Sequence, residues 1–336
     1  MAERPRNHLF EDPDRQTGRG PRVLLVTNVH PLPRQPTLGT FVAEQAASLR
    51  ARGDLGSVDV FVIDGLSARL NYSRAPTMLR AAVRRLQPDL IHAHHGLSGA
   101  VVLAARIGLP LLVTYHGSEV MFHRGQRAIS RRVARRADAN ICVAAAQQPL
   151  LGAPSEVIGC GIDVERFSGL DRSAARARHR VPDGALALLF PGQRWRPVKG
   201  HPRFEAVFER LAATGQRPHE LRLEEIERTA VPSLFAAADV MVMTSLSEGA
   251  PVSIMEALAS GLPVLAPPVG AVAAMLEGID CARVEPFDPD RYAAAVLELA
   301  AVGAPRVRPA NPAAARHDLA KIADRVAAIY HRLALA

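Results

Sequence analysis

Cysteine, leader-like segments and long apolar runs are scarce or missing in this sequence. Only Cys142, Cys160 and Cys281 occur in 336 residues. So few cysteines do not make a disulfide framework, and they favour a reducing compartment. No apolar run reaches the roughly 18 residues that a membrane-spanning helix needs. Residues 1–20 contain Arg, Asp, Pro and Gly but no apolar stretch, so we expect a disordered arm and no signal peptide. These absences predict a cytoplasmic protein.

Lysine and aromatic residues are also rare. Only Lys199 and Lys321 are lysine, so the other 39 of the 41 basic residues are arginine. The net charge of +8 is compatible with nucleic acid, anionic membranes or phosphorylated small molecules as partners. Aromatic residues make up 4% of the chain, with one Trp, and leave little surface on which bases could stack. We therefore expect no nucleic-acid partner.

Buried strands alternate with helices along most of the chain. Continuous apolar runs such as 22–28 and 58–63 are typical of strands that are covered on both faces of a sheet. The connections are too long for hairpins, so the pattern indicates parallel βαβ units. The alternation stops over 155–185 and then restarts. This predicts an α/β protein with two Rossmann-like domains, over 21–165 and 166–312, of which the second is shortened.

The last segment, 313–336, follows a proline-rich connector. Its apolar residues recur at spacings of three and four, which predicts one amphipathic helix over 317–333 with a single apolar stripe. This helix is far along the chain from the second sheet and must bury the stripe elsewhere. The first domain and a partner chain are the two alternatives.

The sharpest motif runs from Glu248 to Glu256 and reads EGAPVSIME. It follows an apolar strand and opens a helix, at the carboxyl end of the second sheet, where ligands of open α/β sheets bind. Backbone N–H groups between the two glutamates stand at a helix N-terminus, which favours an anion. The carboxylates of Glu248 and Glu256 can accept hydrogen bonds from hydroxyl groups of a ligand beside that anion. The alternative is a helix-start carboxylate and a solvated glutamate.

A second polar loop follows the first strand of the second domain and reads FPGQRWRPVKG over 190–200. Cations on this loop could reach a phosphate held at the Glu248 helix. Lys199 stands out because lysine is so rare in this chain, and a position that needs a compact point charge explains it. The alternative is that a rare residue falls here by chance.

Histidines end two strands of the first domain. His92, His94 and His95 follow one strand and His116 follows the next. Such a group suggests zinc, but His95 faces away from His92 and His94, and no cysteine or carboxylate has ligand spacing. We therefore expect no metal site here, and histidines that face a cleft.

One helix of the first domain carries a doubled arginine stripe made of Arg131, Arg132, Arg135 and Arg136. A solvated helix face is one interpretation. The other is peripheral contact with an anionic membrane.

Taken together, these motifs resemble the retaining glycosyltransferases of family 4, which have the two-domain GT-B fold. The resemblance covers roughly residues 22–300. Two glutamates separated by seven residues, here Glu248 and Glu256, and the run on to Val264 are close to the family pattern. In the first domain, the segments that begin at Gly39 and His116 look like family segments.

The diphosphate loop of the family has an arginine followed by a lysine, and Arg194 and Lys199 reproduce that spacing. The piece Arg196-Pro-Val-Lys also resembles a short-form bacterial subgroup, so Arg196 remains an alternative to Arg194. The chain departs from the family pattern after Val264, where the frequent Gly-Gly pair is missing, and one βα unit of the second domain is absent.

The resemblance implies sugar transfer, with retention, from a nucleoside diphosphate sugar bound in a cleft between the domains. Two cationic side chains would take the role of a metal, so neither a metal nor a cofactor is expected. Lys199 and Arg194 would contact the β-phosphate, Glu256 the ribose, Glu248 the sugar, and His116 the donor sugar and the acceptor. The implied catalytic residues are Glu248, His116, Lys199 and Arg194, and the implied substrate-binding residues are Gly39, Arg196, Gly249, Val252, Ser253 and Glu256.

The acceptor would be a glycan, a lipid-linked molecule or a small molecule bound by the first domain, as in cell-envelope polysaccharide synthesis. The resemblance also implies that the helix over 313–336 packs back on the first domain. Two other functions remain open at this point. One is a phosphorylase or synthase of the same fold that uses a sugar phosphate, and the other is a non-catalytic nucleotide-sugar-binding homologue.

Overall fold

The chain forms two compact units. Unit 1 contains the residues up to Gly161 and those from Leu319 onward, and unit 2 is Ile162–Asp318. The expected domain boundaries, at 165/166 and 312/313, lie a few residues from these. The computed structural model describes residues 7–15, 20–33, 38–65, 67–224, 226–301 and 307–335. No helix in these ranges is long and apolar enough to cross a membrane.

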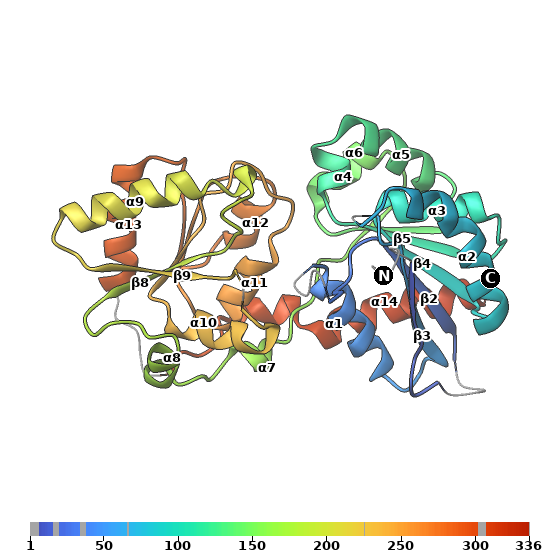
Figure 1. Cartoon of the computed structure of the whole chain (residues 1–336), viewed down its shortest axis with the longest axis horizontal. Coiled ribbons are helices and arrows are strands. Elements are labelled where there is room, and N and C mark those ends of the chain that lie inside the picture. The colour runs from blue at the N-terminus through green and yellow to red at the C-terminus, as the bar shows by residue number, and fades with distance from the viewer. Residues whose placement is uncertain are drawn as a thin grey trace, which may run out of the picture. The chain divides into compact units, whose positions relative to one another are not determined.

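The described part of unit 1 is built on a seven-stranded sheet with the order β1-β3-β2-β4-β5-β6-β7 (Figure 1). The pairs are parallel except for the edge strand β1, which is antiparallel to β3. The strands are β1 (His8–Phe10), β2 (Arg22–Thr27), β3 (Ser57–Val62), β4 (Leu90–His94), β5 (Leu111–Tyr115), β6 (Ala139–Cys142) and β7 (Glu156–Val157).

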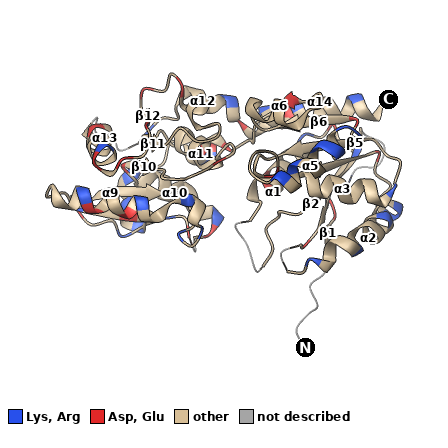
Figure 2. Cartoon of the chain, turned by 90° about the horizontal axis from the view of Figure 1, so that it is seen from above, with Lys and Arg blue, Asp and Glu red and all other residues tan. Residues whose placement is uncertain are grey.

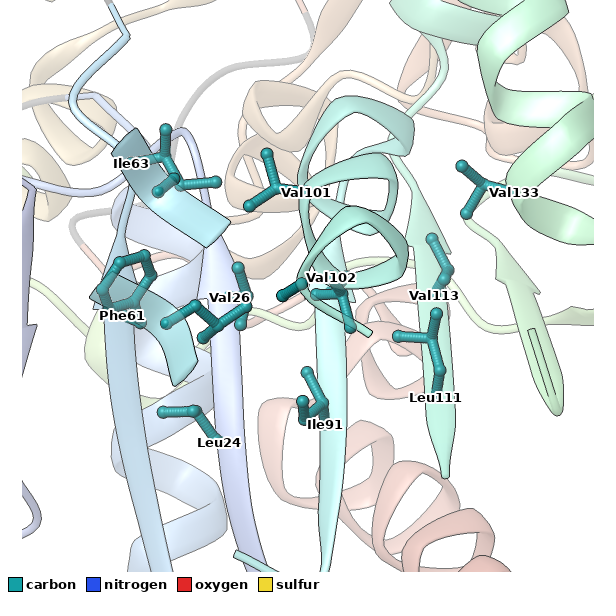
Figure 3. Packing of buried hydrophobic residues seen from close by; sticks show 14 of the residues in the cluster. Leu24, Val26, Phe61, Ile63, Ile91, Val101, Val102, Leu111, Val113 and Val133 are labelled. Carbon is teal, nitrogen blue, oxygen red and sulfur yellow. The ribbon is translucent and has the colours of Figure 1, made fainter. Parts of the chain in front are cut away.

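Helices cover both faces of this sheet. Alternate residues of β2 enter different cores: Leu24 packs with one helix layer and Leu25 with the other. This explains why the strand is a continuous apolar run rather than an alternating one. Figure 3 shows Val101 and Val102 of α3 packed over strand residues such as Ile91. One layer contains α2 (Leu70–Leu86), α3 (Gly96–Ala105) and α5 (Arg124–Ala134), and the other contains α1 (Thr40–Arg50) and α14 (Leu319–Ala334).

The C-terminal helix α14 lies on unit 1, where it contacts α1 and β4. Its apolar stripe is buried among residues of the sheet, with Ile322, Val326 and Tyr330 almost wholly inaccessible. Full burial of each large aliphatic side chain contributes roughly 1.5–3 kcal/mol. The helix is thus an integral part of the unit 1 core.

The expectation of a disordered arm over 1–20 is wrong for residues 7–15, whereas 1–6 and 16–19 lie outside the described residues. Residues His8–Phe10 form β1. Asp12 is buried and accepts a 2.8 Å hydrogen bond from the backbone N–H of Val58, while Arg15 pairs with Asp59 at 2.6 Å. A short edge strand fixed by ion pairs needs no apolar run, so composition gives no sign of it.

Unit 2 contains a five-stranded sheet among its described residues, with the order β12-β11-β10-β8-β9 and all pairs parallel. The α/β class with parallel sheets that the sequence predicts is therefore confirmed for both units. The strands of unit 2 are β8 (Leu186–Phe190), β9 (Pro218–Arg222), β10 (Val240–Val242), β11 (Val264–Ala266) and β12 (Ala282–Val284).

Two longer helices, α9 (His201–Ala213) and α13 (Pro289–Ala301), share one core with the strands of unit 2. Helix α10 contacts β8 and the short helices α7, α8 and α11. The shorter helices are α7 (Val164–Phe167), α8 (Arg172–Arg178), α10 (Val231–Ala237), α11 (Val252–Ala259) and α12 (Val272–Leu276). The short helices of unit 1 are α4 (Ser118–Met121) and α6 (Gln148–Leu151).

Candidate functional site

Two loops of unit 2 meet at the carboxyl edge of its sheet. Strands β8 and β10 are parallel neighbours, with Leu189 opposite Met241. Because the strands end side by side, the loops that follow them lie together as well. The backbone N–H of Leu246 in one loop donates to the carbonyl oxygen of Val198 in the other at 2.8 Å. This contact joins the two segments that the sequence motifs single out.

Lys199 and Glu248 form an ion pair across this junction. Lys199 Nζ lies 2.7 Å from Oε1 of Glu248, and the hydroxyl of Ser245 donates to the same oxygen at 2.6 Å. The Lys199 and Glu248 side chains are 18% and 10% exposed, so the pair is largely shielded from water. The structure thus brings together two predicted residues that are far apart in sequence, and adds Ser245 to them.

Glycines allow these loops to approach closely. Gly200 has φ +69°, and a Cβ there would lie 2.3 Å from the carbonyl oxygen of Thr244. Gly270 has φ +59°, and a Cβ there would lie 2.0 Å from the carbonyl oxygen of Glu248. The loop after β11 is therefore packed against the Glu248 loop, and the Ala271 N–H donates to Gly249 O at 2.8 Å. The loops after β8 and β11 therefore both support the loop that carries Glu248.

Helix α11 starts four residues after Glu248, directly after Pro251. The backbone N–H groups of Val252 and Ser253 belong to its first turn, where an α-helix leaves its donors without intrahelical acceptors. No side chain in the described structure caps this end. These donors and the positive end of the helix favour an anion.

Glu256 lies one turn into α11 and is only 4% exposed. Arg228 Nη1 lies 2.5 Å from its Oε1, and the guanidinium of Arg228 also lies 5.7 Å from the ring centre of Phe167. A solvated glutamate, which the sequence left open, is therefore excluded. The partner residue Arg228 was missed because nothing in the sequence relates it to Glu256.

The predicted diphosphate residues do not all gather around Lys199. Arg194 pairs with Glu224 of the loop after β9, its Nε 3.1 Å from Oε2, and this interaction raises the pKa of the arginine. Arg196 is exposed, and Trp195 between them is 74% exposed. The structure therefore places Lys199, but neither arginine, beside Glu248.

In unit 1, His116 follows β5 and is held by its neighbours. Its backbone N–H donates to Oε1 of the fully buried Glu119 at 2.8 Å. Its ring stacks on that of His94, with Nε2 of His116 3.1 Å from Nδ1 of His94. The ring of Phe41, next to the start of α1, lies 4.8 Å from that of His116. Gly39 precedes this helix with φ +68°, and a Cβ there would lie 2.4 Å from the backbone of Val29.

The strand-end histidines continue into a buried network. His92 and His94 share one face of β4 with ring centres 4.3 Å apart, as their spacing predicts. Nδ1 of His92 lies 2.6 Å from the hydroxyl of Tyr330, and its Nε2 lies 2.8 Å from Oγ1 of Thr114. Burial lowers the pKa of His92 to about 3 and the pKa values of His94 and His116 well below 6.5, so all three rings are neutral near pH 7. Neutral rings of this kind serve as hydrogen-bond donors and acceptors rather than as cations.

A small cavity lies beside His116. About 10 Å³ of it is open to the centre of a water molecule, and Phe41, Gln45, Thr114 and Cys160 are among its lining residues. Burial raises the pKa of the Cys160 thiol to about 12, so this cysteine is not a nucleophile at neutral pH. The cavity has room for one water and not for a sugar.

Two Asp-Pro-Asp segments, 12–14 and 288–290, have a spacing that could suggest a metal site, but their first aspartates have structural roles. Asp12 is bonded within the β1–β3 region, and Asp288 accepts from the Arg291 N–H at 2.9 Å at the start of α13. In the described ranges, no three His, Cys, Asp or Glu side chains form a group that could hold a metal ion.

Comparison with known proteins supports the interpretation of both units. A family model described as glycosyltransferase family 4 matches residues 17–166, and one described as glycosyl transferases group 1 matches residues 174–301. D-inositol 3-phosphate glycosyltransferase 1 of Catenulispora acidiphila is 28% identical over 266 residues, and the match covers 63% of this chain and 63% of that protein. D-inositol 3-phosphate glycosyltransferase of Geodermatophilus obscurus is 29% identical over 263 residues, with coverage of 62% of this chain and 58% of that protein. The chain thus spans about three fifths of the length of these relatives.

Solved structures share the fold at low identity. Sucrose-phosphate synthase of Thermosynechococcus elongatus has a TM-score of 0.75 and 17% identity, and the match covers 93% of this chain and 99% of that one. HepE of Anabaena, solved in complex with UDP-glucose, has a TM-score of 0.66 and 18% identity, with coverage of 92% and 99%. Two glycosyltransferase models match the two halves of the chain in order, and the solved structures share its fold. The chain belongs to the family 4 glycosyltransferases with the GT-B fold.

Proposed function

We propose that this protein transfers a sugar from a nucleoside diphosphate sugar to a glycan, lipid-linked or small-molecule acceptor, with retention at the anomeric carbon. The observation that carries the proposal is the Lys199–Glu248 ion pair beside the first turn of α11. It places a compact cation and free backbone donors where the sheet edge accepts ligands. The low-identity relatives contribute the fold, and the HepE complex supplies one donor to test first.

The chemical barrier in such a transfer is charge separation. The departing diphosphate gains negative charge while the sugar becomes oxocarbenium-like. Lys199 and the N–H groups of Val252 and Ser253 would stabilise the diphosphate as preorganised donors. Because Lys199 is paired with Glu248, a diphosphate that binds there competes with Glu248 for the same ammonium. The released Glu248 carboxylate could then accept hydrogen bonds from hydroxyl groups of the sugar. Gly249, which has no side chain, would let the ligand approach the backbone.

The remaining residues take supporting roles in the proposal. Glu256, which is paired with Arg228, would accept hydrogen bonds from the ribose hydroxyls. Arg194 or Arg196 would add a second cation, and for Arg194 this requires that its pair with Glu224 opens. In unit 1, His116 would contact the donor sugar as a neutral imidazole. Gly39 would let the acceptor approach the backbone.

We also propose that the reaction needs no metal and no cofactor, because cations of the chain take the place of a metal at the diphosphate. Enzyme treated with EDTA should keep nearly all of its rate. A complete loss that manganese or magnesium restores would contradict this part of the proposal.

The test of the main proposal has two stages. Thermal unfolding with UDP, GDP and ADP should show which nucleotide raises the melting temperature, since ligand that binds only the folded chain stabilises it by mass action. Sugars of that nucleotide are then incubated with candidate acceptors, and nucleoside diphosphate release and the anomeric configuration of the product are measured. Release of phosphate instead would identify the sugar-phosphate reaction. Ligand binding without turnover on any donor would indicate a binding protein.

A finer part of the proposal concerns where the acceptor is met. Helix α5 carries arginines and no acidic residue (Figure 2). Arg132 in this helix and Arg136 just after it are exposed, and Ile129, one turn before Arg132, is 37% exposed. Cations next to exposed apolar side chains suit peripheral contact with an anionic bilayer. Vesicles with phosphatidylglycerol should co-sediment the protein at low salt. Arg132→Glu/Arg136→Glu should abolish this, and Arg178→Glu in unit 2 should not.

A further inference from the structure

Three arginines surround one aspartate at the amino-terminal edge of the sheet of unit 2. Asp239 immediately precedes β10, so this cluster lies at the opposite end of that strand from the Glu248 loop. Arg172 and Arg176 of α8 both pair with Asp239, and Nη1 of Arg176 lies 3.2 Å from it. Arg308, from the segment after α13, donates from Nη2 to the carbonyl oxygen of Ala238 at 2.8 Å. The cluster therefore has more positive than negative charge.

Two donors of this cluster have no acceptor among the residues that the structure describes. Arg308 is 6% exposed and forms no ion pair with any described carboxylate, and its Nη1 is buried without a hydrogen-bond partner. Nε of Arg172 is also buried without a hydrogen-bond partner, although the same guanidinium pairs with Asp239 through Nη2. Burial, followed by repulsion from Arg172, lowers the pKa of Arg308 to about 10, with Asp239 opposing and Arg176 adding to the repulsion. The guanidinium is still charged at neutral pH, and an unpartnered charged donor in the interior is costly.

A small cavity lies between these two arginines. Arg172 and Arg308 line it together with Ser260 and three apolar residues, Phe167, Leu170 and Ala236. About 10 Å³ is open to the centre of a water molecule, which is room for one water or one ion of similar size. The hydroxyl of Ser260 already donates to the carbonyl oxygen of Glu256 at 2.8 Å. The two guanidinium groups are therefore the donors that this cavity offers.

We propose that this cavity binds a single small monatomic anion, with chloride as the physiological case, bridging Arg308 and Arg172. An anion accepts hydrogen bonds from both unpartnered donors and also offsets the excess positive charge. A water molecule can accept the hydrogen bonds but does not offset the charge. The cavity is too small for sulfate, phosphate or a nucleotide. The ion joins the segment that carries Arg308 to α8 and so stabilises unit 2. This proposal does not depend on the sugar-transfer function.

Bromide replaces chloride in such a site and can be located by its anomalous scattering. A crystal of the full chain grown or soaked with sodium bromide should show an anomalous peak between Arg172 and Arg308. The absence of any peak there, or a peak that refines as water alone, would overturn the proposal.

Solution measurements provide the second arm. Melting temperatures are compared in sodium chloride and sodium gluconate at the same ionic strength. The melting temperature of the native chain should be about 2–4 °C higher in chloride. Arg308→Met should lose this difference. Arg178→Met, which removes an exposed arginine from α8, the helix that also carries Arg172, should keep it. If Arg308→Met does not fold, the partly exposed Arg172→Met takes its place. Equal responses to chloride in the cavity variant and in Arg178→Met would show that the effect is not site-bound and contradict the assignment.

Discussion

The hydroxyl of Tyr330, near the end of α14, lies 2.6 Å from Nδ1 of His92 in β4. Both side chains are completely buried, and the other nitrogen of His92 lies 2.8 Å from Oγ1 of Thr114. The last helix of the chain thus supplies a polar partner to the histidine network that continues through His94 to His116. Loss of α14 would remove that partner and uncover the apolar face of the sheet.

Replacement of Tyr330 by Phe should therefore destabilise unit 1 although the ring still fills its space. The change leaves a buried nitrogen of His92 without a partner, which costs about 1–3 kcal/mol. Urea unfolding of the native chain and of Tyr330→Phe measures this. In a double-mutant cycle with His92→Leu, the two changes should be strongly non-additive. Additive effects would mean that the hydroxyl and the imidazole do not interact.

Lys199→Ala should reduce kcat/KM by about 10²–10³-fold, because one preorganised charge donor at a leaving group is worth roughly that much. Lys199→Arg should restore only part of the rate, since a guanidinium fork does not replace a compact ammonium. Folding should be retained, because Glu248 keeps its hydrogen bond from Ser245. Lys321→Ala, which removes the other lysine of the chain from an exposed position of α14, is the matched control. Full activity of Lys199→Ala would shift the diphosphate role to Arg194 or Arg196.

Gly270→Ala tests whether the loop after β11 supports Glu248. The added Cβ would lie 2.0 Å from the carbonyl oxygen of Glu248, so one of the two loops must move. Gly278→Ala is the control, because Gly278 also has a positive φ, +72°, but a Cβ there meets nothing within 4 Å. Both variants should lose about 1 kcal/mol of stability from backbone strain. Only Gly270→Ala should also lose activity at saturating donor.

The meeting of Lys199 with Glu248 could be predicted from the sequence, and the reason is topological. Both residues follow apolar strands, and parallel strands end at the same sheet edge. The apolar stripe of α14 could also be predicted, because a helix that buries one face has apolar residues at regular spacings in its sequence.

The partners of the charged residues could not be predicted in this way. Arg194 pairs with Glu224, Arg228 pairs with Glu256, and Arg15, which follows β1, pairs with Asp59 of β3. Such pairs join residues that the packing of several loops brings together, and they leave no periodic pattern. The Glu119 contact to His116 is an exception that could have been found, because a carboxylate three residues on can reach the backbone at a helix start.

The buried histidines predict a loss of stability in acid. In the folded chain, burial holds the pKa of His92 at about 3 and those of His94 and His116 well below 6.5. In the unfolded chain these rings titrate near 6.5, so below that pH the unfolded chain takes up protons that the folded chain excludes. The free energy of unfolding should therefore be constant with respect to these groups above about pH 7 and fall as the pH drops below 6.5.

Each fully excluded histidine contributes a slope of up to about 1.4 kcal/mol per pH unit below 6.5. Urea unfolding at intervals between pH 7.5 and 5 measures the total slope. His92→Gln keeps a polar side chain between Tyr330 and Thr114 but cannot titrate. The slope of the unfolding free energy against pH should therefore decrease by up to the amount that one histidine contributes. His123→Gln replaces an exposed histidine and should leave the slope unchanged. If the native chain and His92→Gln lose stability in parallel as the pH falls, His92 accepts a proton in the folded state and the network is not held neutral.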